Sequence, residues 1–176
     1  MLKEENQLLH SRIEKLIVKD HSCNERKWAT LDLSFMFHLR LLEVGNDCFQ
    51  YVEEMKLIGL SQLIVVVVKA NSFPKYVDSI DCDPNRYFYV KNCEKLKVIE
   101  IGIDSFSDYS VCEIDTLPSL EEIKIGILGA STASFSYSSL ELNSFIGALF
   151  IMDRPPEAEI TPLWSLRFRW LFSGSV

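Results

Sequence analysis

A repeated pattern of aliphatic residues is the feature of this sequence that most restricts its fold. Three segments share the template L-x-x-φ-x-φ-x-x-[ND]-[SC]-F, in which φ is Leu, Val or Ile, and a fourth keeps its first half. These segments are 39–49, 63–73, 96–106 and 120–130. Leu39 and Leu63 are 24 residues apart, as are Leu96 and Leu120. Periods of this length indicate a repeat architecture.

The residues between these segments carry a second matched pattern. Met55-x-Leu57-x-x-Leu60-x-x-Leu63 is typical, and its apolar steps of three favour an extended stretch over a helix. A φ-x-φ segment is a short strand that buries two side chains on one face. One unit cannot bury that face alone, whereas stacked units cover one another. The pattern predicts a solenoid over residues 31–145, with two extended stretches per repeat. An α/β domain with several similar strands is the alternative.

These residues resemble the hallmark of the leucine-rich-repeat superfamily, L-x-x-L-x-L-x-x-N-x-L. The resemblance implies a β-rich leucine-rich-repeat solenoid of short parallel strands, with a phenylalanine spine. It also implies a ladder of hydrogen bonds between repeats at the Asn position, where this chain has Asp47, Asn71, Asp104 and Leu128. An ionised Asp only accepts hydrogen bonds, so we expect a weakened ladder. Gly45, Gly102 and Gly126 follow the strands and predict a tight turn or bulge there.

The sequence flanking the repeats departs from the template. Residues 1–20 predict a helix, because Leu2, Leu9 and Leu16 are seven apart with Asn6 and Ile13 at the alternate heptad position. Such a helix could cap the solenoid or form a homodimeric coiled coil. Residues 21–30 are polar and predict a linker. Residues 146–176 lose the repeat, contain Asp153-Arg-Pro-Pro156, and predict an irregular tail.

Residues 74–87 hold an insertion. The spacing from Leu63 to Leu96 is 33 residues, nine more than the 24-residue period found elsewhere. The segment PKYVDSIDCDPNRY has turn-forming residues and several acids. We expect it to protrude from one edge of the repeat array, where insertions often serve binding.

Composition limits the partners of this chain. Its net charge of −7 and pI near 5.0 argue against binding to nucleic acid, which needs clustered positive charge. The charged N-terminal residues are unlike a signal peptide, and no long uncharged apolar run predicts a membrane span. Five cysteines, an odd number, favour a reducing compartment. We therefore expect an intracellular, cytoplasmic protein.

Motifs for catalysis, cofactors and metals are missing from the sequence. No nucleophile elbow, phosphate-binding glycine loop or zinc-binding helix motif occurs. Asp81-x-Asp83-x-Asn85 opens like a calcium loop, but Arg86 and Asn92 stand where that loop needs Gly and Glu. Expected catalytic, cofactor and metal residues are therefore none, and a hydrolase or transferase would need a pocket that sequence cannot reveal.

The outward positions of the predicted strands give a candidate binding surface. They form two columns across successive repeats, on the face that is concave in the superfamily. One column is Leu41, Val65, Val98 and Glu122, and the next is Glu43, Val67, Glu100 and Lys124. Apolar anchors beside acids suit protein recognition. We expect a non-catalytic protein–protein interaction module that binds an unidentified protein through these columns and the 74–87 loop. The alternative is a structural repeat fragment that self-associates through the N-terminal helix.

Overall fold

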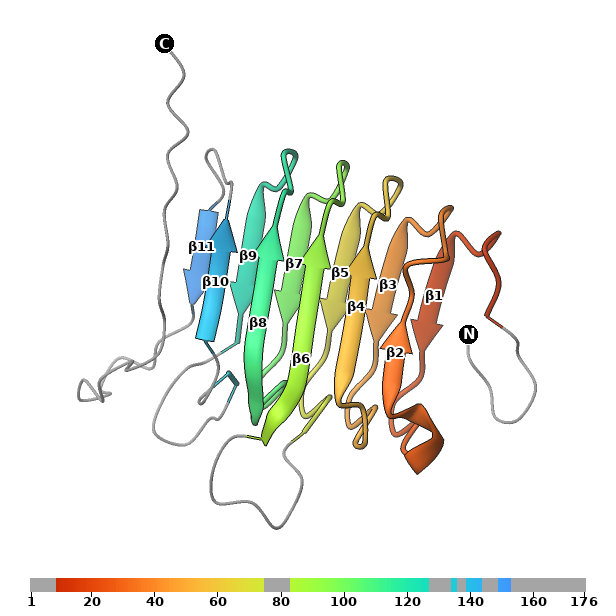
Figure 1. The fold of residues 1–176 in the computed structure, drawn as a ribbon, viewed down its shortest axis with the longest axis vertical. Helices are drawn as coiled ribbons and strands as arrows, with labels where there is room; N and C mark the ends of the chain where they lie inside the picture. Colours follow the sequence, from red (N-terminus) through yellow and green to blue (C-terminus); the bar gives the residue numbers. More distant parts are fainter. Residues whose placement is uncertain (1–8, 75–82, 127–133, 136–138, 144–148, 153–176) are drawn as a thin grey trace.

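Two parallel β-sheets make up the described part of this chain. The computed structural model describes residues 9–74, 83–126, 134–135, 139–143 and 149–152. Sheet A contains β1 (Lys15–Val18), β3 (Leu41–Val44), β5 (Val65–Val68), β7 (Val98–Ile101), β9 (Glu122–Ile125) and β11 (Leu149–Met152), in that order. Sheet B contains β2 (Thr30–Asp32), β4 (Glu54–Ile58), β6 (Asp83–Lys91), β8 (Tyr109–Asp115) and β10 (Ser139–Asn143), also in order. The chain therefore alternates between the sheets strand by strand (Figure 1).

Every strand pairing among the described residues is parallel, and Figure 1 shows the strands of the two sheets running in opposite directions. One odd-numbered strand and the even-numbered strand that follows it are called a unit below. The second extended stretch predicted for each repeat is confirmed, because it forms sheet B. The only helical element among the described residues is a single 3-10 turn, Arg26–Trp28.

The core lies between the sheets, and the predicted aliphatic file is part of it. Leu42, Val66, Ile99 and Ile123 are consecutive register partners in sheet A, and all four are buried. The matched sheet B positions Leu31, Met55, Phe88 and Cys112 are also buried in the same cluster. Burying alternate side chains of both sheets against each other is what stabilises strands of four or five residues.

The predicted N-terminal helix is wrong. Within the described residues 9–20, Lys15–Val18 forms β1, which pairs with β3. Leu16 and Val18 point into the core, while Ile17 between them is 38% exposed. A heptad pattern of fewer than three heptads gives a marginal helix, whereas this strand gains a hydrogen-bonded neighbour and two buried side chains. The expected coiled-coil homodimer and the alternative of self-association both depended on this helix.

The C-terminal boundary of regular structure also differs from expectation. Residues 149–152 form β11, which pairs with β9, although the whole of 146–176 was expected to be irregular. Phe150 and Met152 take the register positions opposite Ile123 and Ile125. The aliphatic strand pattern therefore continues one strand further than the leucine template does. Residues 153–176 lie outside the described part of the chain.

Left-handed backbone recurs at two positions after each of β1, β3, β5 and β7. The φ angle is 54° at Asp47 and 58° at Phe49, and it is 55° at Asn71 and 54° at Phe73. Asn and Asp tolerate this conformation better than other non-glycine residues. Their recurrence at the template's polar position is thus explained by backbone conformation. His21 and Cys23, with φ of 58° and 61°, occupy the equivalent places after β1.

A side-chain ladder links the units one residue later than the resemblance implied. The backbone N–H groups of Cys48, Ser72 and Ser105 each donate to the hydroxyl of the next unit's serine, at 3.2, 3.1 and 3.2 Å. Each hydroxyl in turn donates to a carbonyl at the end of a preceding strand, as in Ser72 Oγ to Gly45 O at 2.6 Å. A serine hydroxyl can donate and accept at once, which is what such a ladder needs.

Replacing Ser105 with alanine is expected to lower the free energy of unfolding by about 1–3 kcal/mol. The change removes the acceptor of the buried Ser72 N–H and the donor to Lys69 O, leaving both groups unsatisfied. Urea denaturation followed by circular dichroism measures the loss. Ser61→Ala, on a partly exposed bend, is the matched control and should change stability by less than about 0.5 kcal/mol. Equal effects of the two substitutions would contradict the ladder.

Close approach between units explains the glycines after the strands. A Cβ added at Gly102 would lie 2.6 Å from the backbone nitrogen of Ala70 in the preceding unit. Gly45 and Gly126 face the preceding unit's backbone in the same way. Of the glycines with described backbone, Gly59 is the one with positive φ. The expected turn or bulge is therefore a close backbone contact that leaves no space for a side chain.

Candidate interaction surface

The outer face of sheet A contains the candidate residues, and the two predicted columns exist in the strand register. Leu41, Val65, Val98 and Glu122 are successive Cα partners, as are Glu43, Val67, Glu100 and Lys124. β1 extends these columns by Lys15 and Ile17, which are the register partners of Leu41 and Glu43. The structure thus brings all eight candidate residues together on one face. Their role in binding remains a prediction.

An apolar cluster occupies the middle of this face. Leu41, Val65 and Val98 are neighbours in one column, and Val67 follows Val65 on the same side of β5. We call these four residues the valine patch. Each is partly exposed, because the core takes only the alternate residues Val66 and Val68. The five-residue apolar run at 64–68 therefore does present side chains on both faces of the sheet.

Charged side chains border the valine patch, and most are paired within the face. Lys69 Nζ lies 2.9 Å from Glu43 Oε1, and this hydrogen bond is the main reason that the pKa of Lys69 is raised. Lys124 Nζ lies 2.9 Å from Glu122 Oε2, which likewise raises the Lys124 pKa. Glu100 is exposed and forms no ion pair within the described part of the chain. It is therefore the acid best placed to meet a cation from outside.

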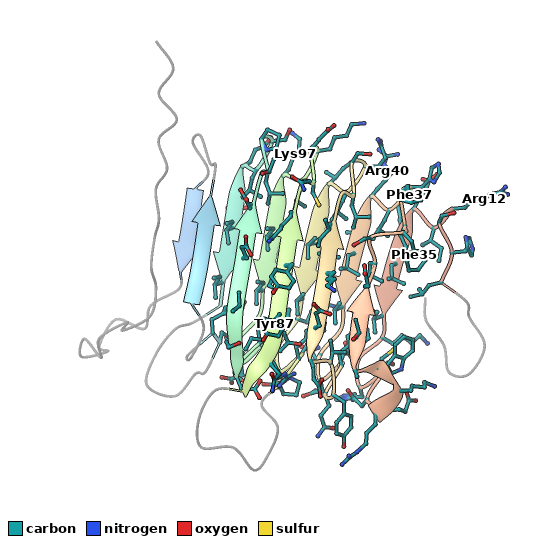
Figure 2. The ribbon with its side chains drawn as sticks, in the orientation of Figure 1. Arg12, Phe35, Phe37, Arg40, Tyr87 and Lys97 are labelled. Carbon is teal, nitrogen blue, oxygen red and sulfur yellow. The ribbon has the colours of Figure 1, made fainter. Side chains whose placement is uncertain are left out.

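The outer face of sheet B is different in character, and sequence reasoning did not single it out. The rings of Tyr87 and Tyr89 stack at 6.0 Å with an interplanar angle of 5°. Lys91 Nζ lies 4.9 Å from the centroid of the Tyr89 ring and 2.6 Å from Glu113. The alternation around the buried Phe88 was the signal that could have located this face. Tyr87 is seen on the front of the molecule in Figure 2.

Two lysines on sheet B are each paired with a glutamate of the same sheet. Lys56 and Glu54 lie two residues apart on β4 and pair at 2.9 Å, with each side chain 29% exposed. The hydrogen bond from Lys56 to Glu54 raises the pKa of Lys56. Charges that are already paired gain little from an outside partner, since an exposed pair contributes at most about 1 kcal/mol. Sheet A, with its apolar centre, is the better candidate for binding.

A buried arginine organises the base of the 74–87 insertion. Arg86, 3% exposed, donates from Nη1 to Pro74 O at 2.7 Å and from Nη2 to Val52 O at 2.8 Å. It also forms an ion pair with the fully buried Asp108. Its guanidinium lies 4.4 Å from the centroid of the Tyr109 ring. Both ends of the insertion are thus fixed to the core, whereas its residues 75–82 lie outside the described part of the chain.

Tyr109 completes this network. Its hydroxyl donates to Val52 O at 2.6 Å, and burial is the main cause of its raised pKa. The hydroxyl therefore stays neutral and keeps donating at physiological pH. These contacts are directed at backbone carbonyls, which identifies the network as a structural anchor for the insertion.

The two cysteines at repeat positions, Cys93 and Cys112, are not suited to act as nucleophiles. Cys93 and Cys112 are buried at apolar positions, and burial raises the pKa of Cys93 to about 11 and that of Cys112 further. A thiol with such a pKa is protonated and a poor nucleophile. Cys82 and Asp81 lie outside the described residues. The described part of the chain contains no group of three His, Cys, Asp or Glu residues able to hold a metal ion.

Two phenylalanines are exposed at one corner of the molecule. Phe35 is 40% exposed and Phe37 is 58% exposed, on the bend between β2 and β3. Figure 2 shows them at the same corner as Arg12 and Arg40. This bend is next to β1, the edge strand of sheet A, and lies outside the two predicted columns. Among the described residues, no helix is both long and apolar enough to cross a membrane.

Comparison with known proteins provides no identification. The chain matches no protein-family model, no curated protein and no solved structure.

Proposed function

We propose that this chain is a leucine-rich-repeat solenoid that acts as a non-catalytic protein–protein interaction module. The unit-by-unit alternation between two parallel sheets supports the solenoid, as does the repeat of the template in β3, β5, β7 and β9. The partner binds the outer face of sheet A, together with the 74–87 insertion. This is an intracellular role, and it needs neither a cofactor nor a metal ion.

The valine patch is the single observation that carries this proposal. It places adjacent apolar side chains on three neighbouring strands, outside the core and between charged residues. Apolar anchors surrounded by polar groups are the arrangement in which a few residues supply most of the binding energy. A protein surface with an apolar projection and a nearby cation would match Val65, Val98 and Glu100.

Val65→Glu/Val98→Glu is expected to abolish capture of the partner. The test is quantitative pull-down from cells that express the tagged chain, followed by affinity measurement on the recovered partner. Burying two unpaired carboxylates in the interface should weaken binding at least about 30-fold, which corresponds to about 2 kcal/mol. The fold should survive, because Glu122 already occupies the same column.

Tyr87→Glu/Tyr89→Glu places two carboxylates on the outer face of sheet B and is the matched control. It should leave the partner set unchanged. Thermal unfolding of each variant shows whether lost binding reflects lost structure. Identical partner sets for the wild type and the sheet A variant would contradict the proposal.

A further inference from the structure

Two phenylalanines on the bend between β2 and β3 depart from the burial pattern of the chain. Phe35 and Phe37 are the most exposed large apolar side chains in the described part of the chain, at 40% and 58%. They alternate with Met36, which is fully buried, so both lie on the outer side of the bend. A phenylalanine ring has no polar group that can bond with water, and its exposure is therefore unfavourable. This bend is where the surface would gain most from an apolar environment.

The repeat itself does not require aromatic residues at these two places. Each bend ends at a buried leucine of the template, which is Leu39 in this unit. Aligned on that leucine, the later units have Gly59 and Ser61, Asn92 and Glu94, and Thr116 and Pro118 in place of the two phenylalanines. Small, polar or turn-forming residues thus suffice for the bend. The two rings are an addition to one unit, and packing of the solenoid does not explain them.

The segment that precedes β1 lies against the same bend. His38 Nδ1 lies 3.0 Å from Ser11 O, and the Arg40 backbone N–H donates to Glu14 O at 2.7 Å. These two contacts bring the segment that contains Arg12 next to the bend. Figure 2 shows the side chains of Arg12 and Arg40 at the same corner as the two phenylalanines.

Positive charge predominates at this corner. We call residues 9–15 together with residues 33–40 the aromatic corner. It contains three cations and one acid, which are Arg12, Lys15, Arg40 and Glu14. Arg12 and Arg40 are exposed, and neither forms an ion pair with another described residue. The whole chain has a net charge of −7, so this excess of cations is local and favours an anionic partner.

An anionic lipid surface fits this combination better than an acidic protein does. Aromatic rings enter the boundary between headgroups and acyl chains, while arginine and lysine attract anionic headgroups. A stable protein interface covers about 800 Å² on each partner. The apolar part of the aromatic corner is two side chains on an outward bend, with charged residues around them. A bilayer needs only that tip to enter, whereas a protein partner would need a wider apolar surface.

We propose that the aromatic corner binds the surface of an anionic lipid bilayer. Phe35 and Phe37 insert at the headgroup boundary, and Arg12 and Arg40 contact the lipid phosphates. This inference goes beyond the proposed function and uses no residue of the valine patch. Its failure would therefore leave the sheet A proposal standing and separately testable.

Vesicle co-sedimentation tests the proposal with lipids of two compositions. The full chain should bind phosphatidylcholine vesicles that contain about one-third phosphatidylserine at least about 30-fold more tightly than pure phosphatidylcholine vesicles. Arg12→Gln/Arg40→Gln should weaken binding to the anionic vesicles about 30-fold, because each cation near the surface contributes about a five-fold factor. Phe35→Ser/Phe37→Ser should weaken it at least about 10-fold, because the inserted apolar area is lost.

Two control variants match these changes at other places in the fold. Lys95→Gln/Lys97→Gln removes two cations from the bend before β7, where Lys97 takes the template position of Arg40. Ile103→Ser removes a side chain that is 37% exposed and follows β7, at the opposite end of the sheet A strands. Both should keep the affinity within about twofold at physiological ionic strength, where distant charges are screened. Thermal unfolding followed by circular dichroism shows that each variant retains its fold.

Insertion is distinguished from surface attraction by Phe37→Trp, which keeps an aromatic ring and should keep the affinity. The emission of the added tryptophan is the difference between the spectra of this variant and of the wild type. It should shift to the blue on anionic vesicles and be quenched by lipids with brominated acyl chains. A difference spectrum that vesicles leave unchanged would contradict insertion.

Three further results would overturn the proposal. One is equal affinity of the wild type for the neutral and the anionic vesicles. Another is unchanged vesicle binding in both corner variants, which would place the lipid contact elsewhere in the chain. The third is a wild type that ignores vesicles but is retained on immobilised poly-glutamate through Arg12 and Arg40, which would assign the corner to an acidic protein.

Discussion

Replacing Phe106 with alanine is expected to lower the free energy of unfolding by about 3–5 kcal/mol. Phe106 is fully buried and stacks on Phe73 at 4.5 Å and on Phe88 at 4.5 Å. It also contacts Phe135 at 5.4 Å and the Tyr109 ring edge-on at 5.0 Å. Its removal leaves a cavity among aromatic rings from three successive units.

The size of this effect can be separated from backbone strain. Phe106 has a φ of 56°, and alanine, which also has a Cβ, carries a similar conformational cost. The stability difference therefore reports packing. Urea denaturation monitored by circular dichroism gives the value. Phe37→Ala is the matched control, because Phe37 is 58% exposed and should change stability by less than about 0.5 kcal/mol. A loss below about 1 kcal/mol at Phe106 would contradict the stacked core.

Replacing Arg86 with methionine is expected to destabilise the chain by about 3–5 kcal/mol. The change leaves the buried Asp108 carboxylate without its cation and removes two hydrogen bonds to Val52 O. It also releases Pro74 O, at the start of the insertion. We therefore expect faster proteolysis within residues 75–85 together with the lower stability.

A double-mutant cycle distinguishes a lost ion pair from lost packing. Arg86→Met/Asp108→Leu removes both charges and should recover part of the stability lost in Arg86→Met. The matched control is Lys91→Met, which breaks the partly exposed pair with Glu113 and should cost at most about 1 kcal/mol. Additive effects of the Arg86 and Asp108 substitutions would show that the ion pair contributes little.

Much of the fold follows from local sequence. The template locates β3, β5, β7 and β9, and the second pattern locates the strands of sheet B. The alternation φ-x-φ states which side chains are buried, since period-2 burial is a local property of a strand. Because the template places the strand at the same position in each segment, the two outward columns that contain Val65 and Glu100 could also be predicted.

Other features depended on neighbours that the sequence does not reveal. Leu16 and Val18 fit both a heptad and a strand, and pairing with β3 decided for the strand. The first unit could not be recognised from the template, because it has His21 and Cys23 where the next unit has Asp47 and Phe49. The left-handed backbone that these four residues share is visible only in the structure. The serine ladder and the sheet B face likewise depend on contacts between units.

The sequence by itself determined the repeat, the burial pattern and the composition of the sheet A face, because each depends on residue type and spacing within a unit. Only the tertiary structure decided where the strands begin and end along the sheets, which side chains carry the ladder, and how Arg86 anchors the insertion. Those outcomes are set by hydrogen bonds and packing between residues more than twenty positions apart in the chain, as from Arg86 to Val52 and Asp108. Their free energy exceeds the local preferences of short segments.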